Sequence, residues 1–271
     1  MASTPKKDGV RAKRAEGTRS KAAPASTPKR AAADDIPGPR QPVGLKVDPL
    51  PPGKRPDNRL LFGRTVTLEP LDPSRHAMPL FEGFDAKSDP DGEIWTYLPY
   101  GPWTDYTSFY HWLSTQAAGT DPKFYAIVPR RSQKAEGVAT YLNIRPELGV
   151  LEVGHIWFTP QLQKTRAATE AIFLMMKHAF EDLGCRRFEW KCDSLNAPSR
   201  AAAKRYGFRF EGIFRKHMIV KGRNRDTAWF SITNDDWPDI RMGFQAWLAD
   251  ENFDDDGKQR KPLGAFVRPG E

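Results

Sequence analysis

The segment 158–171 has the residue types of an anion-binding helix start. A strand pattern ends at Phe158, and a helical pattern begins after Thr165 with the small residues Ala167 and Ala168. The first N–H groups of a helix lack partners within the helix, and the helix dipole places partial positive charge beside them. Small side chains leave these groups accessible, so the segment could bind a pyrophosphate. Small residues also begin helices simply to pack closely, and this segment alone does not separate the two interpretations.

A second polar cluster, Asn196 to Ser199, follows the next predicted strand. Asn196 suits the N-cap of a helix, and Pro198 suits its first turn. The amide of Asn196 and the hydroxyl of Ser199 could instead contact a ligand that lies between two strand ends. Tyr206 is interpreted as a packing residue.

The elements that must position these residues follow from hydrophobic periodicity, which alternates in strands and repeats every three or four residues in helices. In chain order the sequence predicts strand 66–71, helices 73–84 and 106–118, a meander of strands 124–128, 137–144 and 150–158, helix 167–183, strand 186–193, a helix opened by Asn196, a hairpin of strands 208–220 and 226–233 across a turn at 221–224, and helix 237–248. Gly184 is predicted to end the helix that precedes it.

Charge and composition divide the chain into three regions. Residues 1–57 have few large apolar side chains, and the first 40 residues carry ten Lys or Arg against four Asp or Glu. We therefore expect a disordered basic tail at 1–57, a folded domain at 58–250 and a polar C-terminal tail at 251–271. Most of the net charge of +8 lies in the first tail. No recognition-helix or zinc pattern accompanies that charge, so we do not expect a nucleic-acid partner.

The two cysteines, Cys185 and Cys192, are too few for a disulfide framework or a metal site. Cys192 shares a predicted strand face with Phe188 and Trp190, which indicates a buried, reduced thiol. No apolar run approaches the roughly 20 residues that span a bilayer, and no secretory signal is expected. These observations favour a cytoplasmic protein without a metal cofactor.

The ordered motifs resemble the GNAT acetyltransferases, and within them the ribosomal-protein N-acetyltransferases. The resemblance rests on the order of elements, the junction at 158–171, Asn196-x-x-Ser199 followed by Gly207-Phe208, and the segments 211–215 and 222–226. It covers roughly residues 60–240. It implies an α/β (α+β) fold in which a central mixed, mostly antiparallel sheet, flanked by helices, is splayed between its fourth and fifth strands.

The resemblance also implies acetyl-CoA as cosubstrate, with its pyrophosphate on the main-chain amides of 163–168 and its arm between the splayed strands. The residues that would bind it are Phe158, Gln163, Lys164, Thr165, Arg166, Ala167, Ala168, Asn196 and Ser199. Arg166 stands where the family usually has Gly. Its Cβ could crowd the phosphates unless the backbone keeps an ordinary conformation, or its charge could add a contact to a phosphate. We expect binding to be retained.

The resemblance further implies two catalytic residues. Many relatives protonate the leaving thiolate with a Tyr at the position of Ala203, whereas the ribosomal-protein branch uses a serine, which here is Ser199. Glu152 lies at the spacing where some relatives place a general base, with His155 and His217 in reserve. Strand alternation predicts that only one of Glu152 and His155 faces the cleft, unless a bulge intervenes.

The acceptor side is predicted to include an aromatic stretch, Trp95, Tyr97, Tyr100 and Trp103, preceded by Asp89, Asp91 and Glu93. This composition suits an amine. We therefore expect an N-acetyltransferase that acts on a small-molecule amine, slightly favoured over a protein N-terminus, as a monomer or homodimer. The alternatives are a catalytically inactive CoA-binding sensor or interaction module and, more distantly, a nucleic-acid binder.

Overall fold

The computed structural model describes residues 41–84 and 91–267. The chain divides into two units, 1–47 and 48–271, and every described helix and strand belongs to the second. The second unit thus begins at Asp48, before the expected boundary at residue 58. The predictions for residues 1–40 lie outside the described residues. Within the described ranges, no helix combines the length and apolar character needed to cross a bilayer.

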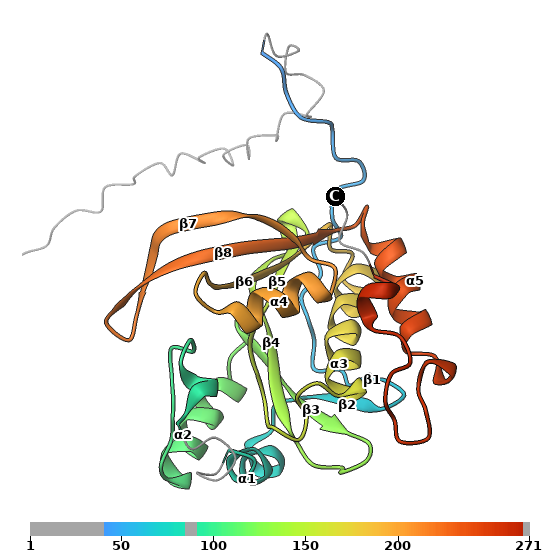
Figure 1. The fold of residues 1–271 in the computed structure, drawn as a ribbon. Coiled ribbons are helices and arrows are strands. Elements are labelled where there is room, and N and C mark those ends of the chain that lie inside the picture. Colours follow the sequence, from blue (N-terminus) through green and yellow to red (C-terminus); the bar gives the residue numbers. More distant parts are fainter. Residues whose placement is uncertain (1–40, 85–90, 268–271) are drawn as a thin grey trace, which may run out of the picture. The chain divides into compact units, whose positions relative to one another are not determined.

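The described strands form one mixed sheet in the order β1-β2-β3-β4-β5-β6-β8-β7 (Figure 1). Its neighbours pair antiparallel except β5 and β6, which are parallel. The strands are β1 Leu61–Phe62, β2 Val66–Pro70, β3 Lys123–Pro129, β4 Gly137–Arg145, β5 Val150–Phe158, β6 Arg187–Asp193, β7 Arg209–Val220 and β8 Arg223–Thr233. This is the mixed, mostly antiparallel sheet expected from the sequence.

Helices cover both faces of this sheet. They are α1 Pro73–Glu82, α2 Tyr106–Ala117, α3 Arg166–Lys177, α4 Ala197–Arg205 and α5 Trp237–Trp247. One buried cluster joins α3, α4 and α5 to the sheet, and a second joins α1 and α2 to its other face. Along β3, Tyr125 and Ile127 belong to the first cluster, while Phe124, Ala126 and Val128 belong to the second. Burial on both faces explains the continuous apolar run of this strand.

Two predicted boundaries differ from the structure by more than two residues. Regular α-helix stops at Lys177, and a π-helical turn, His178–Asp182, continues to the expected cap Gly184, whose φ is +68°. The hairpin turn consists of Lys221 and Gly222 alone, since β8 already begins at Arg223. Both turn residues have positive φ, at 48° and 74°, which favours a two-residue turn that matches the twist of the strands.

Part of the expected polar tail at 251–271 packs against the domain within the described residues, which end at 267. Leu263 is fully buried and Val267 is 2% exposed, both in the core cluster around α5. An added Cβ at Gly243 would lie 2.5 Å from the carbonyl oxygen of Phe266, so α5 needs a glycine there. The segment is mostly polar, and its apolar residues, which lie mainly at 263–267, are too few to establish a periodic pattern.

Candidate functional site

The sheet opens between β5 and β6, where their parallel pairing ends at Val153 and Trp190. Beyond that pair, β5 continues to Phe158 and contains a bulge, because Gly154 pairs with Thr140 while Trp157 pairs with Val138. Two residues of β5 therefore oppose one of β4, and His155 takes a φ of +47°. A bulge bends the strand that carries it, here in the segment where β5 no longer pairs with β6.

A cavity of about 650 Å³ lies at this opening. Its walls come from β4, β5, β6, the start of α4, the β7–β8 hairpin and the loop 94–99. Both Glu152 and His155 line the cavity, because the exception to strict alternation, a bulge in the strand, is present here. The bulge after Gly154 shifts the strand by one residue and brings His155 to the same side as Glu152.

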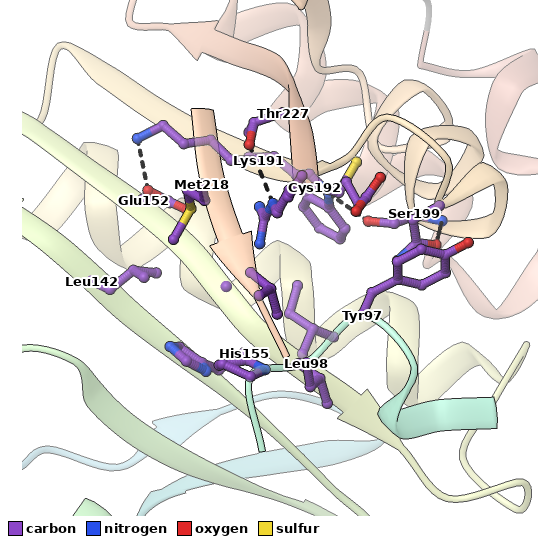
Figure 2. Close-up of a pocket in the computed structure, with 18 of the residues that line it drawn as sticks. Tyr97, Leu98, Leu142, Glu152, His155, Lys191, Cys192, Ser199, Met218 and Thr227 are labelled. Carbon is purple, nitrogen blue, oxygen red and sulfur yellow. Dashed lines mark hydrogen bonds and ion pairs between the residues drawn. The ribbon is translucent and has the colours of Figure 1, made fainter. Parts of the chain in front are cut away.

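The carboxylate of Glu152 is buried, and the ammonium of Lys191 balances its charge (Figure 2). Its Oε2 accepts a hydrogen bond from Asn143 Nδ2 at 2.6 Å and forms an ion pair with Lys191 Nζ at 2.8 Å. Lys191 also pairs with Glu189 at 2.7 Å and lies over the ring of Trp229. Among the described residues, both partners of this carboxylate bind Oε2, so Oε1 is the oxygen available to a bound molecule.

Ser199 lines the same cavity at the first turn of α4. Its backbone N–H donates to Asn196 Oδ1 at 3.0 Å, so Asn196 is the N-cap that the sequence predicted. Its Oγ accepts a hydrogen bond from Trp190 Nε1 at 3.0 Å, which leaves the hydroxyl proton able to point elsewhere. Cys192 also lines the cavity, and burial raises the pKa of its thiol although the Ser199 hydroxyl beside it acts in the opposite direction.

His155 is held in the cavity wall by the aromatic loop. Its Nδ1 lies 3.0 Å from the hydroxyl of Tyr100, and the two rings stack with an interplanar angle of 10°. Burial, with a smaller contribution from the positive charge of Arg225, lowers the pKa of His155 to about 4. The imidazole is therefore neutral at pH 7, and its basicity is poorly matched to accepting a proton from an amine at that pH.

The pKa of His155 predicts an acid-sensitive fold. Between pH 6.5 and about 4 the unfolded chain binds a proton that the folded protein does not, so stability falls as the pH falls through this window and is unaffected above it. At pH 5 the loss is about 2 kcal/mol. Urea unfolding at pH 7 and pH 5 measures it. His155→Gln should reduce this pH dependence, whereas His111→Gln, at an exposed position, should not. If the free energy of unfolding changes equally between pH 7 and pH 5 in the parent and both variants, the assignment to His155 is wrong.

The aromatic stretch divides between core and cavity. Trp95 is buried and packs edge-on against Trp103 with centroids 5.2 Å apart, so these two residues are structural. Tyr97 lines the cavity, whereas Tyr100 does not line it and stacks on the ring of His155. The acidic residues expected before the aromatic stretch do not line the cavity within the described residues. Asp91 and Glu93 are exposed at other positions, and Asp89 lies outside the described residues.

A second cavity, of about 810 Å³, lies at the start of α3. The basic residues among its lining side chains are Arg64, Arg130, Arg131, Lys164, Arg166, Arg205 and Lys258, against the single acid Asp256. Thr165 caps the helix through Ala168 N–H at 3.1 Å. Among the described residues, the backbone N–H groups of Arg166 and Ala167 have no hydrogen-bond partner. The helix start is thus available to an anion within a basic cavity.

Arg166 does not block this helix start. Its guanidinium pairs with Asp250 at 2.8 Å, donates to the carbonyl of Leu248 and lies over the ring of Phe253. Arg166 begins the helix without positive φ, whereas the preceding Lys164 has φ +60°. The residue in place of the usual Gly therefore keeps an ordinary backbone and ties the C-terminal segment to α3.

The predicted coenzyme residues divide between the two cavities. Lys164, Thr165, Arg166 and Ala167 line the second, whereas Asn196 and Ser199 line the first. The remaining three line neither cavity. Gln163 Nε2 donates to the carbonyl of Phe158 at 3.0 Å, and Ala168 is buried.

Several residues that line the first cavity were missed by the sequence analysis. They include Lys191, which pairs with Glu152, and Arg225, Thr227 and Trp229 on β8. The three β8 residues alternate along the strand, and this i, i+2, i+4 spacing is the signal that could have placed them on one face. No local pattern indicates which element that face opposes.

The comparisons with known proteins agree with this geometry. The model of the acetyltransferase (GNAT) domain matches residues 65–209, more than half of the chain. A crystal structure of a GCN5-related N-acetyltransferase from Brucella melitensis is 44% identical, with a TM-score of 0.77 over 80% of this chain and 97% of that chain. An uncharacterized N-acetyltransferase of Bacillus subtilis, YnaD, is 25% identical over 150 residues, which are 54% of this chain and 84% of that protein.

A further Bacillus subtilis protein, provisionally named the ribosomal N-acetyltransferase YdaF, is 29% identical over 86 residues, or 32% of this chain and 46% of that protein. The resemblance that the sequence motifs indicated is thereby confirmed. The splayed sheet, the open helix start and the family match together lead to one identification: the chain belongs to the GNAT family of acetyltransferases.

Proposed function

We propose that the protein uses acetyl-CoA to acetylate the primary amine of a small molecule. Acetyl transfer is the activity of the family to which the chain belongs. The observation that carries the proposal is the pairing of an open, basic helix start at α3 with a polar cavity at the split between β5 and β6.

The residues of the second cavity fit the phosphates of CoA. The free N–H groups of Arg166 and Ala167 and the surrounding Lys and Arg side chains supply donors and positive charge for a diphosphate. On the side that faces β6, β5 has no paired strand beyond Val153 among the described residues, so its backbone there is free to bond an extended arm. When bound, acetyl-CoA would supply the activated acyl group as a thioester.

Within the first cavity, two side chains are suited to moving protons. The Ser199 Oγ accepts from Trp190, so its own proton is directed elsewhere, and we assign Ser199 as the donor to the departing sulfur. Glu152 Oε1 is assigned as the acceptor of the amine proton, directly or through water. Lys191 and Asn143 hold the carboxylate in position through Oε2, which keeps Oε1 oriented.

A contact between the hairpin turn and the loop beside the first cavity favours a small acceptor. The β7–β8 hairpin projects beyond the end of β6 (Figure 1), and the Lys221 ammonium at its turn donates to the carbonyls of Trp95 at 2.8 Å and Gly101 at 3.0 Å. This contact joins the hairpin turn to the loop that contains Trp95 and Gly101, next to the cavity-lining residues Val220 and Pro99. A folded protein presenting its N-terminus would have to displace it, whereas a small amine would not.

Thiol release from acetyl-CoA in a screen of amines and N-terminal peptides tests the proposal on the full chain. We expect turnover with small amines and a loss of about 100-fold in kcat for Ser199→Ala, the lower end of the usual contribution of a proton-transferring side chain. Ser194→Ala, a nearby serine that does not line the cavity, is the matched control. CoA binding without turnover of any amine refutes the enzymatic proposal, and turnover confined to peptides refutes the small-molecule part.

A further inference from the structure

Arg225 on β8 is a charged side chain in the first cavity without a carboxylate partner among the described residues. Its Nε donates to Thr227 Oγ1 at 3.2 Å, and Thr227 is fully buried. This bond orients the guanidinium, and the described residues provide no hydrogen-bond partner for its terminal nitrogens. A guanidinium that is oriented through Nε and has both terminal nitrogens free to donate can bind a planar anion such as a carboxylate.

The other strongly charged residues of the cavity are already engaged. Lys191 pairs with Glu152 and Glu189, and Arg145 pairs with Glu189 at 3.4 Å. Asp193 Oδ1 accepts the backbone N–H of Leu195. Asp193 is the remaining carboxylate of the cavity lining, and among the described residues neither it nor Glu152 forms an ion pair with Arg225.

The positive charge of Arg225 acts on His155, which lies on the β5 wall of the cavity. Arg225 lies on β8 and His155 on β5, on the two sides of the space that β6 leaves when it ends at Asp193. Its charge contributes to the lowered pKa of His155, after burial as the larger cause. The guanidinium thus faces the space where an acceptor would lie, across from the β5 wall that carries Glu152.

We propose that Arg225 binds a carboxylate of the acceptor, so that the substrates are small molecules carrying both an amine and a carboxylate. This inference rests on the proposed function. CoA itself offers no anion here, because its charged groups are phosphates and those fit the separate cavity at α3. The amine is then directed to Glu152, and the carboxylate to the Arg225 guanidinium on the β8 wall. An amine without the second group leaves Arg225 unpaired and binds more weakly.

The test compares matched substrates on the full chain. A panel of α- and ω-amino acids is assayed beside the corresponding carboxamides, which keep the size and the amine but remove the negative charge. For the preferred amino acid, we expect Arg225→Gln to lower kcat/KM roughly 10- to 100-fold, mainly through KM, the range for a lost hydrogen-bonded charge contact. The carboxamide should be affected little by the same substitution. Arg223→Gln, an exposed charge two residues away on the same strand, is the matched control.

Two additional readouts keep the outcomes distinct. Arg225→Lys should restore part of the preference for the carboxylate if charge is what matters. NMR titration should show the pKa of His155 rising in Arg225→Gln but not in Arg223→Gln, which checks that the guanidinium faces the cavity in the folded protein.

Each result decides between the proposals. Equal rates for carboxylates and carboxamides, or an equal loss for both in Arg225→Gln, overturn the role of Arg225 while leaving amine acetylation intact. A failure of every amine, with or without a carboxylate, refutes the proposed function itself. Preferred turnover of acidic N-terminal peptides over free amino acids would overturn the small-molecule assignment.

Discussion

Ala167→Glu is expected to weaken CoA binding by about 100-fold. Because Ala167 is only 6% exposed and belongs to the core cluster, the substitution should also lower the free energy of unfolding. Ala167 lines the basic cavity at α3, and its backbone N–H is one of those without a partner. A carboxylate there would stand a few ångströms from a bound diphosphate, where repulsion costs on the order of 1–4 kcal/mol. The same carboxylate favours the helix itself, because a negative charge suits the positive end of the dipole. Isothermal titration with CoA measures the effect.

The matched control is Thr107→Glu, which places an identical charge at the second residue of α2. Thr107 is exposed and lines neither cavity, so this variant should bind CoA as the parent does. Thermal denaturation should show both variants folded. Undiminished CoA affinity in Ala167→Glu would place the phosphates elsewhere and remove the basis of the coenzyme assignment.

Glu152→Gln is expected to lower kcat by about 100-fold without changing CoA affinity, because the amide can no longer accept the amine proton. The substitution also leaves Lys191 with only Glu189 as an ion-pair partner. We therefore expect a loss of about 1–3 kcal/mol in the free energy of unfolding. Stopped-time assays at saturating acetyl-CoA and urea unfolding give the two quantities separately.

Glu69→Gln serves as the control for a lost ion pair. Glu69 pairs with Arg75 and with the buried His76, away from both cavities. Its substitution should destabilise the protein without reducing kcat. If Glu152→Gln keeps its turnover, the carboxylate is a structural partner of Lys191, and proton acceptance passes to water or to His217, which also lines the cavity.

The sequence by itself determined the features that depend on local chemistry. The N-caps Thr165 and Asn196 set the starts of α3 and α4 through hydrogen bonds that span three residues. Strand β5 has the bounds 150–158 that its pattern predicted, flanked by turn residues on one side. The order of elements followed as well, because periodicity and caps report on each segment separately.

Only the tertiary structure decided which residues meet across the cavity. The bulge at His155 depends on how β5 pairs with β4, so alternation within β5 alone could not decide whether both Glu152 and His155 face the cavity. The pairing of Glu152 with Lys191 and the open guanidinium of Arg225 arise between strands far apart in the chain. The C-terminal segment packs through Leu263 and Val267, and their burial depends on contact with the core cluster around α5. Such contacts depend on the register and packing of distant elements, and no short stretch of sequence encodes them.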